Sequence, residues 1–239
     1  MILIGIDPAP SKPSTVYDGK NFGDMTPVAL SGFLQKQKDV FVAWDAPLTI
    51  TEGMGENNRH PVYQREIEYV SKKRGGKNLP SGISVLGAAG CPHWAVSQFC
   101  LGFPNPYSPH TCLLPEGKNA FQLVTGQDHQ RPEKGRYVTE VHPARAMLDL
   151  LPDRTAWDYK KGTAGSRGIL TRKIADELVD RGFLAPGDLT TIFQKTASGA
   201  ADRLDAAVAF RLLYHWYHKT AQDIDFFVRE GASWLTRVA

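Results

Sequence analysis

The chain opens with Met1-Ile2-Leu3-Ile4-Gly5-Ile6-Asp7, an apolar run that stops at a carboxylate. An unbroken apolar run of this length is typical of a strand covered on both faces, at the centre of a parallel or mixed sheet. Pro8 cannot donate a hydrogen bond to a neighbouring strand, so the pairing should end there. The sequence therefore predicts that Asp7 lies at the carboxyl end of a central strand, where open α/β sheets place their binding and catalytic residues.

Two later stretches have a similar design. An apolar run, an acid and a proline recur in Val40-Phe41-Val42-Ala43-Trp44-Asp45-Ala46-Pro47-Leu48. A shorter strand pattern with an acid and a proline close behind it is Arg136-Tyr137-Val138-Thr139-Glu140-Val141-His142-Pro143. We therefore expect three strands whose ends carry Asp7, Asp45 and Glu140.

The remaining segments predict helices and short strands around these three. Residues 15–22 indicate a tight hairpin with an Asp18-Gly19 turn, and residues 26–30 a third, edge-type strand. A helix is expected at 32–38, with Ser31 as its N-cap. Later helices are expected at 144–151, 167–181 and 202–219, where the last is the longest and its alanines let it lie close to the sheet. The overall expectation is an α/β fold.

The chain is expected to form a single domain, 1–239, with a large loop-rich insertion at about 50–134. At 239 residues and 42% hydrophobic content it is long enough to bury one sizeable core. The insertion holds all three cysteines and eight of the sixteen prolines, and it shows no strand set of its own. We therefore read it as loops carried over a site, not as a second domain.

Charge and cysteine content favour a cytoplasmic protein. The formal net charge of +3 is mildly basic, which is compatible with an anionic partner but is also explained by solubility alone. No apolar run reaches the length of about 18 residues that a membrane span needs. The apolar strand begins at the first residue, which leaves no place for a secretory signal. An odd number of cysteines argues against a disulfide framework and for a reducing compartment.

Five acids form the main candidate site. Asp7, Asp45 and Glu140 come from strand ends, and Asp202 and Asp205 project from one face at the start of the longest helix, three residues apart. Carboxylates packed together raise one another's pKa unless a cation neutralises them, and such oxygen ligands suit Mg²⁺ or Mn²⁺. Two ions about 4 Å apart stabilise the attacking and leaving oxygens of a phosphoryl displacement. The sequence leaves open which of Asp202 and Asp205 binds metal.

Each acid also has an ordinary structural interpretation. Asp45 could cap a turn, Glu140 could pair with Arg145, and Asp202 could be an N-cap. His142 follows Glu140 by two residues and would share its strand face. It could carry a proton to a leaving group, or it could be hydrogen-bonded for structural reasons.

These residues together carry a resemblance to the ribonuclease-H-like superfamily, through Gly5-Ile6-Asp7, a mid-chain strand ending in an acid, and a late Asp-x-x-Asp-Ala helix. The helix sequence Asp202-Arg203-Leu204-Asp205-Ala206 is similar to the last acidic motif of bacterial Holliday-junction resolvases. Trp44-Asp45-Ala46-Pro47-Leu48 followed by Glu140-Val141-His142-Pro143 resembles a domain-of-unknown-function family of predicted RNase-H-like nucleases. The likeness covers residues 1–47 and 136–210, whereas the size of the insertion departs from simpler members.

The resemblance implies a mixed five-stranded sheet flanked by helices and a two-metal nuclease site. Asp7 would bridge two Mg²⁺ or Mn²⁺ ions, with Asp45 and Glu140 on one side and Asp205, with or without Asp202, on the other. The predicted activity is hydrolysis of phosphodiester bonds in DNA or RNA. A nucleic-acid contact is expected at the flexible basic turn of the insertion, which contains Lys72, Lys73, Arg74 and Lys77. A charge run of this kind is also typical of a solvated helix end, and a second basic group lies at Lys160-Lys161.

Two rival functions remain open at this point. An ATP-dependent kinase of the related actin-like fold also begins Gly-Ile-Asp, although Pro8-Ala9-Pro10-Ser11 is a poor match to its phosphate loop. A non-catalytic module that binds nucleic acid or protein through a decayed site is the other rival. The presence of all five acids argues against it.

Overall fold

A computed structural model describes residues 1–9, 12–45, 121–124, 131–151, 159–160, 163–194, 199–218, 224–229 and 232–237. Most of the predicted insertion therefore lies outside the described residues. The basic turn with Lys72, Lys73, Arg74 and Lys77 lies there too. Within the described part of the chain, no helix is long and apolar enough to span a membrane.

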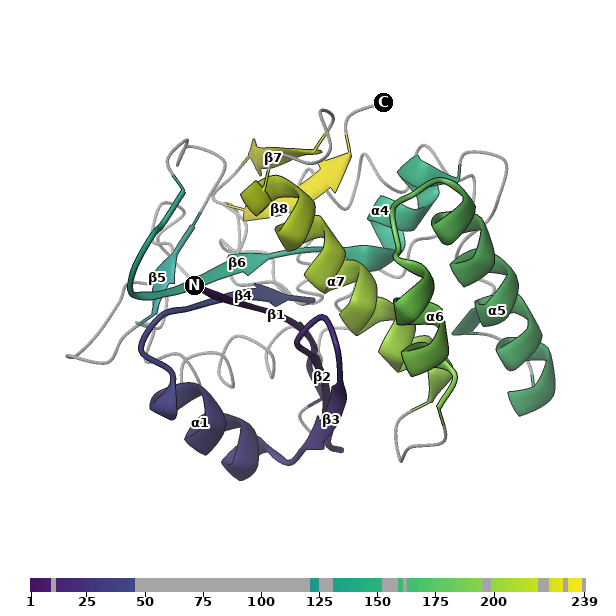
Figure 1. The fold of residues 1–239 in the computed structure, drawn as a ribbon, viewed down its shortest axis with the longest axis horizontal. Coiled ribbons are helices and arrows are strands. Elements are labelled where there is room, and N and C mark those ends of the chain that lie inside the picture. Colours follow the sequence, from purple (N-terminus) through teal and green to yellow (C-terminus); the bar gives the residue numbers. More distant parts are fainter. Residues whose placement is uncertain are drawn as a thin grey trace, which may run out of the picture.

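The structure is a mixed α/β fold built on one six-stranded sheet (Figure 1). Five strands have four to six residues and a two-residue strand, β5, lies at one edge. The spatial order is β3 (Phe22–Met25), β2 (Ser14–Tyr17), β1 (Ile2–Asp7), β4 (Val40–Trp44), β6 (Arg136–Glu140) and β5 (Gln122–Leu123). Strand β1 pairs antiparallel with β2 and parallel with β4, and β6 is parallel to both β4 and β5. The prediction that β1 is central is confirmed, and β5 belongs to the predicted insertion.

The parallel strands β1, β4 and β6 end at the same edge of the sheet. Ile6 is paired with Trp44, and Trp44 is paired with Glu140. The backbone N–H of Asp45 donates to the carbonyl of Ile6 at 3.0 Å. The carboxyl ends of the three strands are therefore in register beside one another.

Helices cover both faces of the sheet and define two apolar layers. On one face α1 (Pro27–Lys36) packs on a core that includes Ile4, Ile6 and Trp44. On the other face lie four helices whose buried residues share a core with Leu3 and Phe41, and Figure 1 shows the longest of them crossing the sheet. These helices are α4 (Pro143–Leu150), α5 (Ala164–Asp180), α6 (Pro186–Ile192) and α7 (Ala200–His218).

Gly5 lets α7 lie directly against β1. A Cβ atom at this position would come within 2.2 Å of the carbonyl oxygen of Ala206 and 2.4 Å of the backbone nitrogen of Phe210. Ala206 and Ala207 are fully buried at this contact, as the alanine-rich start of the helix predicted. The close approach brings the N-terminal half of α7 to the end of β1.

 The predicted N-terminal hairpin is present, but its bounds differ from the prediction, because its second strand runs from Phe22 to Met25. The turn between the strands is held by the Asp18 carboxylate, which accepts from the backbone N–H groups of Lys20 and Asn21 at 2.8 and 2.7 Å. Gly19 has a φ of +90°, a conformation that glycine adopts without strain.

The predicted edge strand at 26–30 is wrong, because these residues begin helix α1. Thr26 is the N-cap, and its Oγ1 accepts from the backbone N–H of Ala29 at 3.3 Å. Pro27 occupies the first turn, where its fixed φ suits a helix and its missing N–H costs nothing. Ser31 therefore lies inside the helix and is not its cap.

The later helices agree with the prediction, with shifts at their ends. Helix α5 begins three residues before the predicted start, because the Thr163 side chain accepts from the N–H of Ser166. Helix α6 was not predicted. Near the C-terminus, β7 (Ile224–Arg229) and β8 (Ala232–Arg237) form a separate antiparallel pair.

Candidate metal centre

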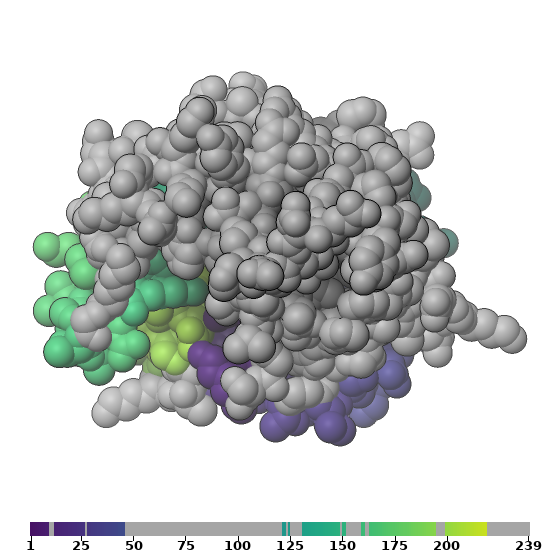
Figure 2. Space-filling model, turned by 180° about the vertical axis from the view of Figure 1, so that it is seen from behind, coloured from purple at the N-terminus to yellow at the C-terminus, as the bar shows by residue number. Residues whose placement is uncertain are grey.

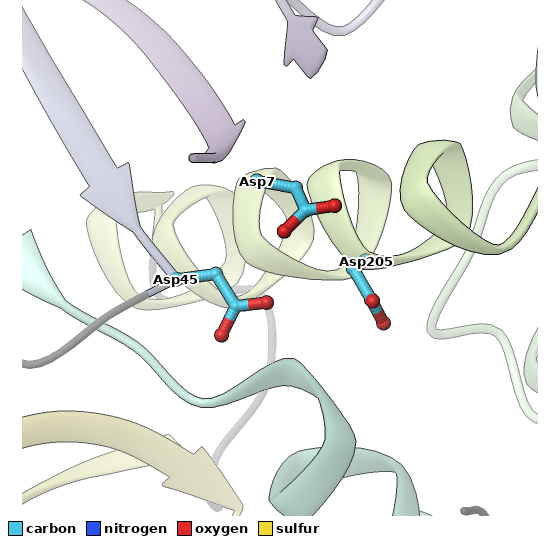
Figure 3. A group of neighbouring side chains, drawn as sticks. All are labelled: Asp7, Asp45 and Asp205. Carbon is cyan, nitrogen blue, oxygen red and sulfur yellow. The ribbon is translucent and has the colours of Figure 1, made fainter. Parts of the chain in front are cut away.

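Three of the five predicted acids meet at the edge of the sheet where the parallel strands end. Asp7 is the last residue of β1, Asp45 directly follows β4, and Asp205 lies near the start of α7. One carboxylate oxygen from each lies within 4.8 Å of the other two. Figure 3 shows Asp7 and Asp45 projecting from two neighbouring strand ends and Asp205 projecting from the helix. We call these three residues the acidic triad.

Strand alternation and the Gly5 contact together explain why the triad forms. Side chains two residues apart on a strand point to the same face, so Asp7 shares the α7 face with Gly5. By the same rule, Asp45 shares that face with Ala43, whose side chain belongs to the α7-side core. The sheet therefore supplies two carboxylates, and the helix packed against it supplies the third.

The carboxylate of Asp205 has two partners from one short segment. It is fully buried, and the hydroxyl of Tyr159 donates to its Oδ1 at 2.5 Å. The ammonium of Lys160 forms an ion pair with its Oδ2. Tyr159 is fully buried, whereas the side chain of Lys160 is 47% exposed. Sequence analysis singled out Lys160 only as part of a basic group and missed Tyr159.

Asp7 and Asp45 differ from Asp205 in their contacts. Both are half-buried. Within the described residues, no hydrogen bond or ion pair reaches either of their side chains. Within the described part of the chain, Asp205 therefore has a hydrogen-bond donor and a cationic partner, whereas the half-buried carboxylates of Asp7 and Asp45 have neither.

Another buried acid, Asp188, shows how this fold treats a structural carboxylate. Arg211 contacts both of its oxygens, at 2.7 and 2.9 Å. The hydroxyl of Tyr17 and the backbone N–H of Ala185 also donate to it, at 2.5 and 2.7 Å. Two charge-assisted bonds from one guanidinium and two further donors satisfy this acid without any ion. Among the described residues, no such set of donors surrounds the triad.

The electrostatics of the triad disfavour its charged form. Burial raises the pKa of Asp7 to about 8, and the charges of Asp205 and Asp202 add to this effect while Lys160 and Lys12 oppose it. Burial, followed by the charges of Asp205 and Asp7, also raises the pKa of Asp45 well above its ordinary value. Burial raises the pKa of Asp205, against the opposing effect of Lys160 and Tyr159. A cation is what would keep three such groups ionised together.

Lys160 and Tyr159 keep their protons beside these acids. Burial opposes the charge of Lys160, but the carboxylate of Asp205, with Tyr159 and Asp7, raises the pKa of its ammonium overall. Burial and the charge of Asp205 raise the pKa of Tyr159. The phenol therefore remains a hydrogen-bond donor and the lysine remains a cation.

Asp202 lies outside the triad. It is half-buried in the first turn of α7, and its Oδ2 pairs with the ammonium of Lys12 at 2.7 Å. Figure 2 shows purple N-terminal atoms beside yellow-green atoms of the α7 region on the rear face, in agreement with this pair. Among the two candidates, Asp205 is the acid that faces Asp7 and Asp45.

Glu140 is not brought into the triad. Its side chain is 2% exposed. Alternation along β6 assigns it to the α1 face with Val138, whereas Asp7 and Asp45 point to the α7 face. Its charge still contributes to the raised pKa of Asp45, after the larger effects of burial and the triad itself.

His142 makes a structural hydrogen bond of the kind that the sequence allowed for. It is the N-cap of α4, and its Nδ1 accepts from the backbone N–H of Arg145 at 3.4 Å. His142 lies beyond the end of β6 and is the residue from which α4 begins. It therefore does not continue the strand face on which Glu140 lies. The predicted contacts of Lys72, Lys73, Arg74 and Lys77 with nucleic acid lie outside the described residues.

The donor set of the triad fits a hard divalent cation. Three carboxylate oxygens within 4.8 Å of one another are the ligand type that Mg²⁺ and Mn²⁺ prefer. The Lys160 ammonium at Oδ2 of Asp205 shows that positive charge is already accommodated at this position. No protein-family model matches the chain, and neither the curated proteins nor the solved structures give a significant match. The geometry and charge of the triad therefore carry the functional conclusion.

Proposed function

We propose that this protein is a Mg²⁺- or Mn²⁺-dependent nuclease that hydrolyses phosphodiester bonds of DNA or RNA. The observation that supports it best is the convergence of Asp7, Asp45 and Asp205 from β1, β4 and α7. These residues are separated by most of the chain, and two of their side chains have no protein partner within the described residues. Burying such groups is costly, and a bound cation would offset that cost.

We infer a ribonuclease-H-like fold from the resemblance of the sequence motifs. A mixed sheet flanked by helices, with an acid at the end of the first strand and another on the last long helix, agrees with that expectation.

In this proposal the triad holds the metal, and neighbouring side chains position it. Ions bound there would stabilise the attacking and leaving oxygens of the phosphoryl displacement. Tyr159 fixes the rotamer of Asp205 through its 2.5 Å hydrogen bond, so this carboxylate stays aimed at the triad.

The test is cleavage of fluorescently labelled single- and double-stranded DNA and RNA with Mg²⁺ or Mn²⁺. The wild-type protein should cut at least one of these substrates, and a chelator should stop it. Asp45→Asn removes one ligand charge while keeping the shape of the side chain, and should reduce the rate by about 100-fold or more. Asp176→Asn on the exposed face of α5 is the matched control and should cleave like the wild type.

Other outcomes would favour the rivals. Mn²⁺ binding without cleavage of any of the four substrates would favour a non-catalytic binding module. ATP consumption in the absence of nucleic acid would favour the kinase. Equal cleavage by the wild type and Asp45→Asn would contradict the assignment of the triad.

A further inference from the structure

We propose that Lys160 is a displaceable internal counter-ion whose ammonium occupies the cation position of the acidic triad until a divalent ion replaces it. This inference rests on the proposed metal site and adds a competing residue to it. It concerns the binding of the metal itself and is independent of which nucleic acid is cleaved.

The contacts of Asp205 show which oxygen the metal and the lysine would share. Its Oδ1 is taken by the hydroxyl of Tyr159 at 2.5 Å, from a side chain that is fully buried. The ammonium of Lys160 pairs with the other oxygen, Oδ2. Because Oδ1 already accepts this hydrogen bond, we assign Oδ2, the oxygen that Lys160 holds, to an ion that coordinates Asp205 together with Asp7 and Asp45.

Two cations cannot share this oxygen at low cost. Like charges a few ångströms apart repel each other even in water, and the repulsion is larger at a buried carboxylate. Binding of a divalent ion should therefore expel the ammonium from Oδ2.

Lys160 is placed so that it can leave. Its side chain is 47% exposed while that of Asp205 is fully buried, so part of the lysine side chain already borders solvent. A lysine is a point charge on a flexible stem, and its charge can return to water without breaking a fixed bidentate geometry. Arg211 on Asp188 is the contrasting case in this fold, because its guanidinium contacts both oxygens of the carboxylate and its side chain is only 14% exposed.

The first experiment measures Mn²⁺ binding by calorimetry, with no nucleic acid present. Lys160→Gln removes the competing charge and should bind Mn²⁺ about fivefold more tightly than the wild type, the size expected for loss of a partly exposed ion pair. Lys173→Gln, an exposed lysine on α5, is the matched control and should bind like the wild type. Measurable binding by Lys160→Gln alone would also support the proposal.

Equal or weaker Mn²⁺ binding by Lys160→Gln would overturn the counter-ion assignment, since Lys160 would then have no effect on Mn²⁺ affinity or would increase it. Absence of binding by both proteins would overturn the metal site as well. A protein that binds Mn²⁺ in the expected order but cleaves nothing would keep the counter-ion and refute the nuclease. The two proposals therefore fail in different measurements.

The second experiment uses the wild-type protein and so does not depend on the folding of a variant. An amine-reactive reagent labels lysines, and mass spectrometry gives the labelling rate of Lys160 relative to Lys173. Mn²⁺ should increase this ratio several-fold, because the ammonium released from Asp205 becomes accessible. The increase should be absent in Asp45→Asn. An unchanged or lower ratio in the wild type at saturating Mn²⁺ would overturn the proposal.

Discussion

At the scale of single residues, the hydrogen bond from Tyr159 to Asp205 is the contact that fixes the buried member of the triad. Tyr159→Phe would leave Oδ1 of Asp205 buried with one donor fewer. We expect a loss of about 1–3 kcal/mol in the free energy of unfolding, since a buried polar atom left unsatisfied costs its desolvation. Urea denaturation measures this loss, and Tyr137→Phe, a half-buried tyrosine on β6, is the control. Equal stability of Tyr159→Phe and the wild type would contradict this role.

A second prediction at this scale concerns pH. The pKa of Asp7 is raised from 3.8 to about 8 in the folded protein, chiefly by burial. Between these two values the folded state holds a proton that the unfolded state has lost, so stability should fall as pH rises through this window. Melting temperatures from pH 5 to pH 8.5 in a chelator should therefore decrease.

The comparison with Asp7→Asn isolates this effect. The variant cannot ionise at this position, so its melting temperature should depend less steeply on pH than that of the wild type. A wild-type melting temperature that rises across the window would contradict the raised pKa of Asp7.

The three members of the triad were among the five acids that the sequence singled out, because each follows a strong local pattern. Asp7 and Asp45 each follow an apolar strand, and Asp205 is part of an acidic helix start. Tyr159 could not be found in this way, since it lies in a short segment whose proximity to Asp205 depends on tertiary packing. The position of Glu140 could not be predicted either. The strand pattern predicts an acid at the end of the strand, but it does not predict to which face of the sheet that acid points.

At the scale of secondary-structure elements, the packing of α7 on β1 controls the distance between Asp205 and Asp7. Gly5→Ala would place a methyl group 2.2 Å from the carbonyl oxygen of Ala206, so the helix must move away from the strand. We expect a loss of about 1–3 kcal/mol in stability, as is usual for overpacking. We also expect weaker Mn²⁺ binding, because Asp205 moves with the helix.

Gly168→Ala is the matched control for this prediction. No atom lies within 4 Å of a Cβ built at Gly168, which sits inside helix α5. Alanine is favoured over glycine there by up to about 1 kcal/mol, so this variant should be neutral or more stable. Urea denaturation of both variants gives the comparison, and a stable Gly5→Ala with unchanged Mn²⁺ affinity would contradict the close-packing argument.

Element prediction from the sequence succeeded for buried strands and long helices and failed where a cap decided the outcome. The run at 26–30 has apolar residues compatible with a strand. Thr26 and Pro27 together initiate a helix instead, through an N-cap hydrogen bond and a pre-set φ. Helix α6 was missed because its seven residues include a proline and a glycine and are too few to show a clear period.

At the scale of the whole molecule, the triad connects segments that are distant along the chain. β1, β4 and α7 are joined by packing, but the three carboxylates at their meeting point oppose that packing through burial and mutual repulsion. Ionising these carboxylates therefore opposes the packing at this place in the fold. Such a cost at one place is typical of functional sites in otherwise well-packed proteins.

It follows that a divalent ion should stabilise the entire fold. A ligand that binds only the folded state adds about 2.7 kcal/mol of stability at a concentration 100 times its dissociation constant. For a chain of 239 residues this corresponds to an increase of about 5–10 °C in melting temperature. Circular dichroism melts with increasing Mn²⁺ would measure it.

Asp176→Asn should show the full increase, because its carboxylate is an exposed partner of Arg172 on α5 and lies outside the triad. Asp45→Asn should show little of it, since one of the three ligand charges is gone. An equal increase in Asp45→Asn and the wild type would mean that Mn²⁺ acts elsewhere on the protein, and the triad would then be a cluster of buried acids without a metal.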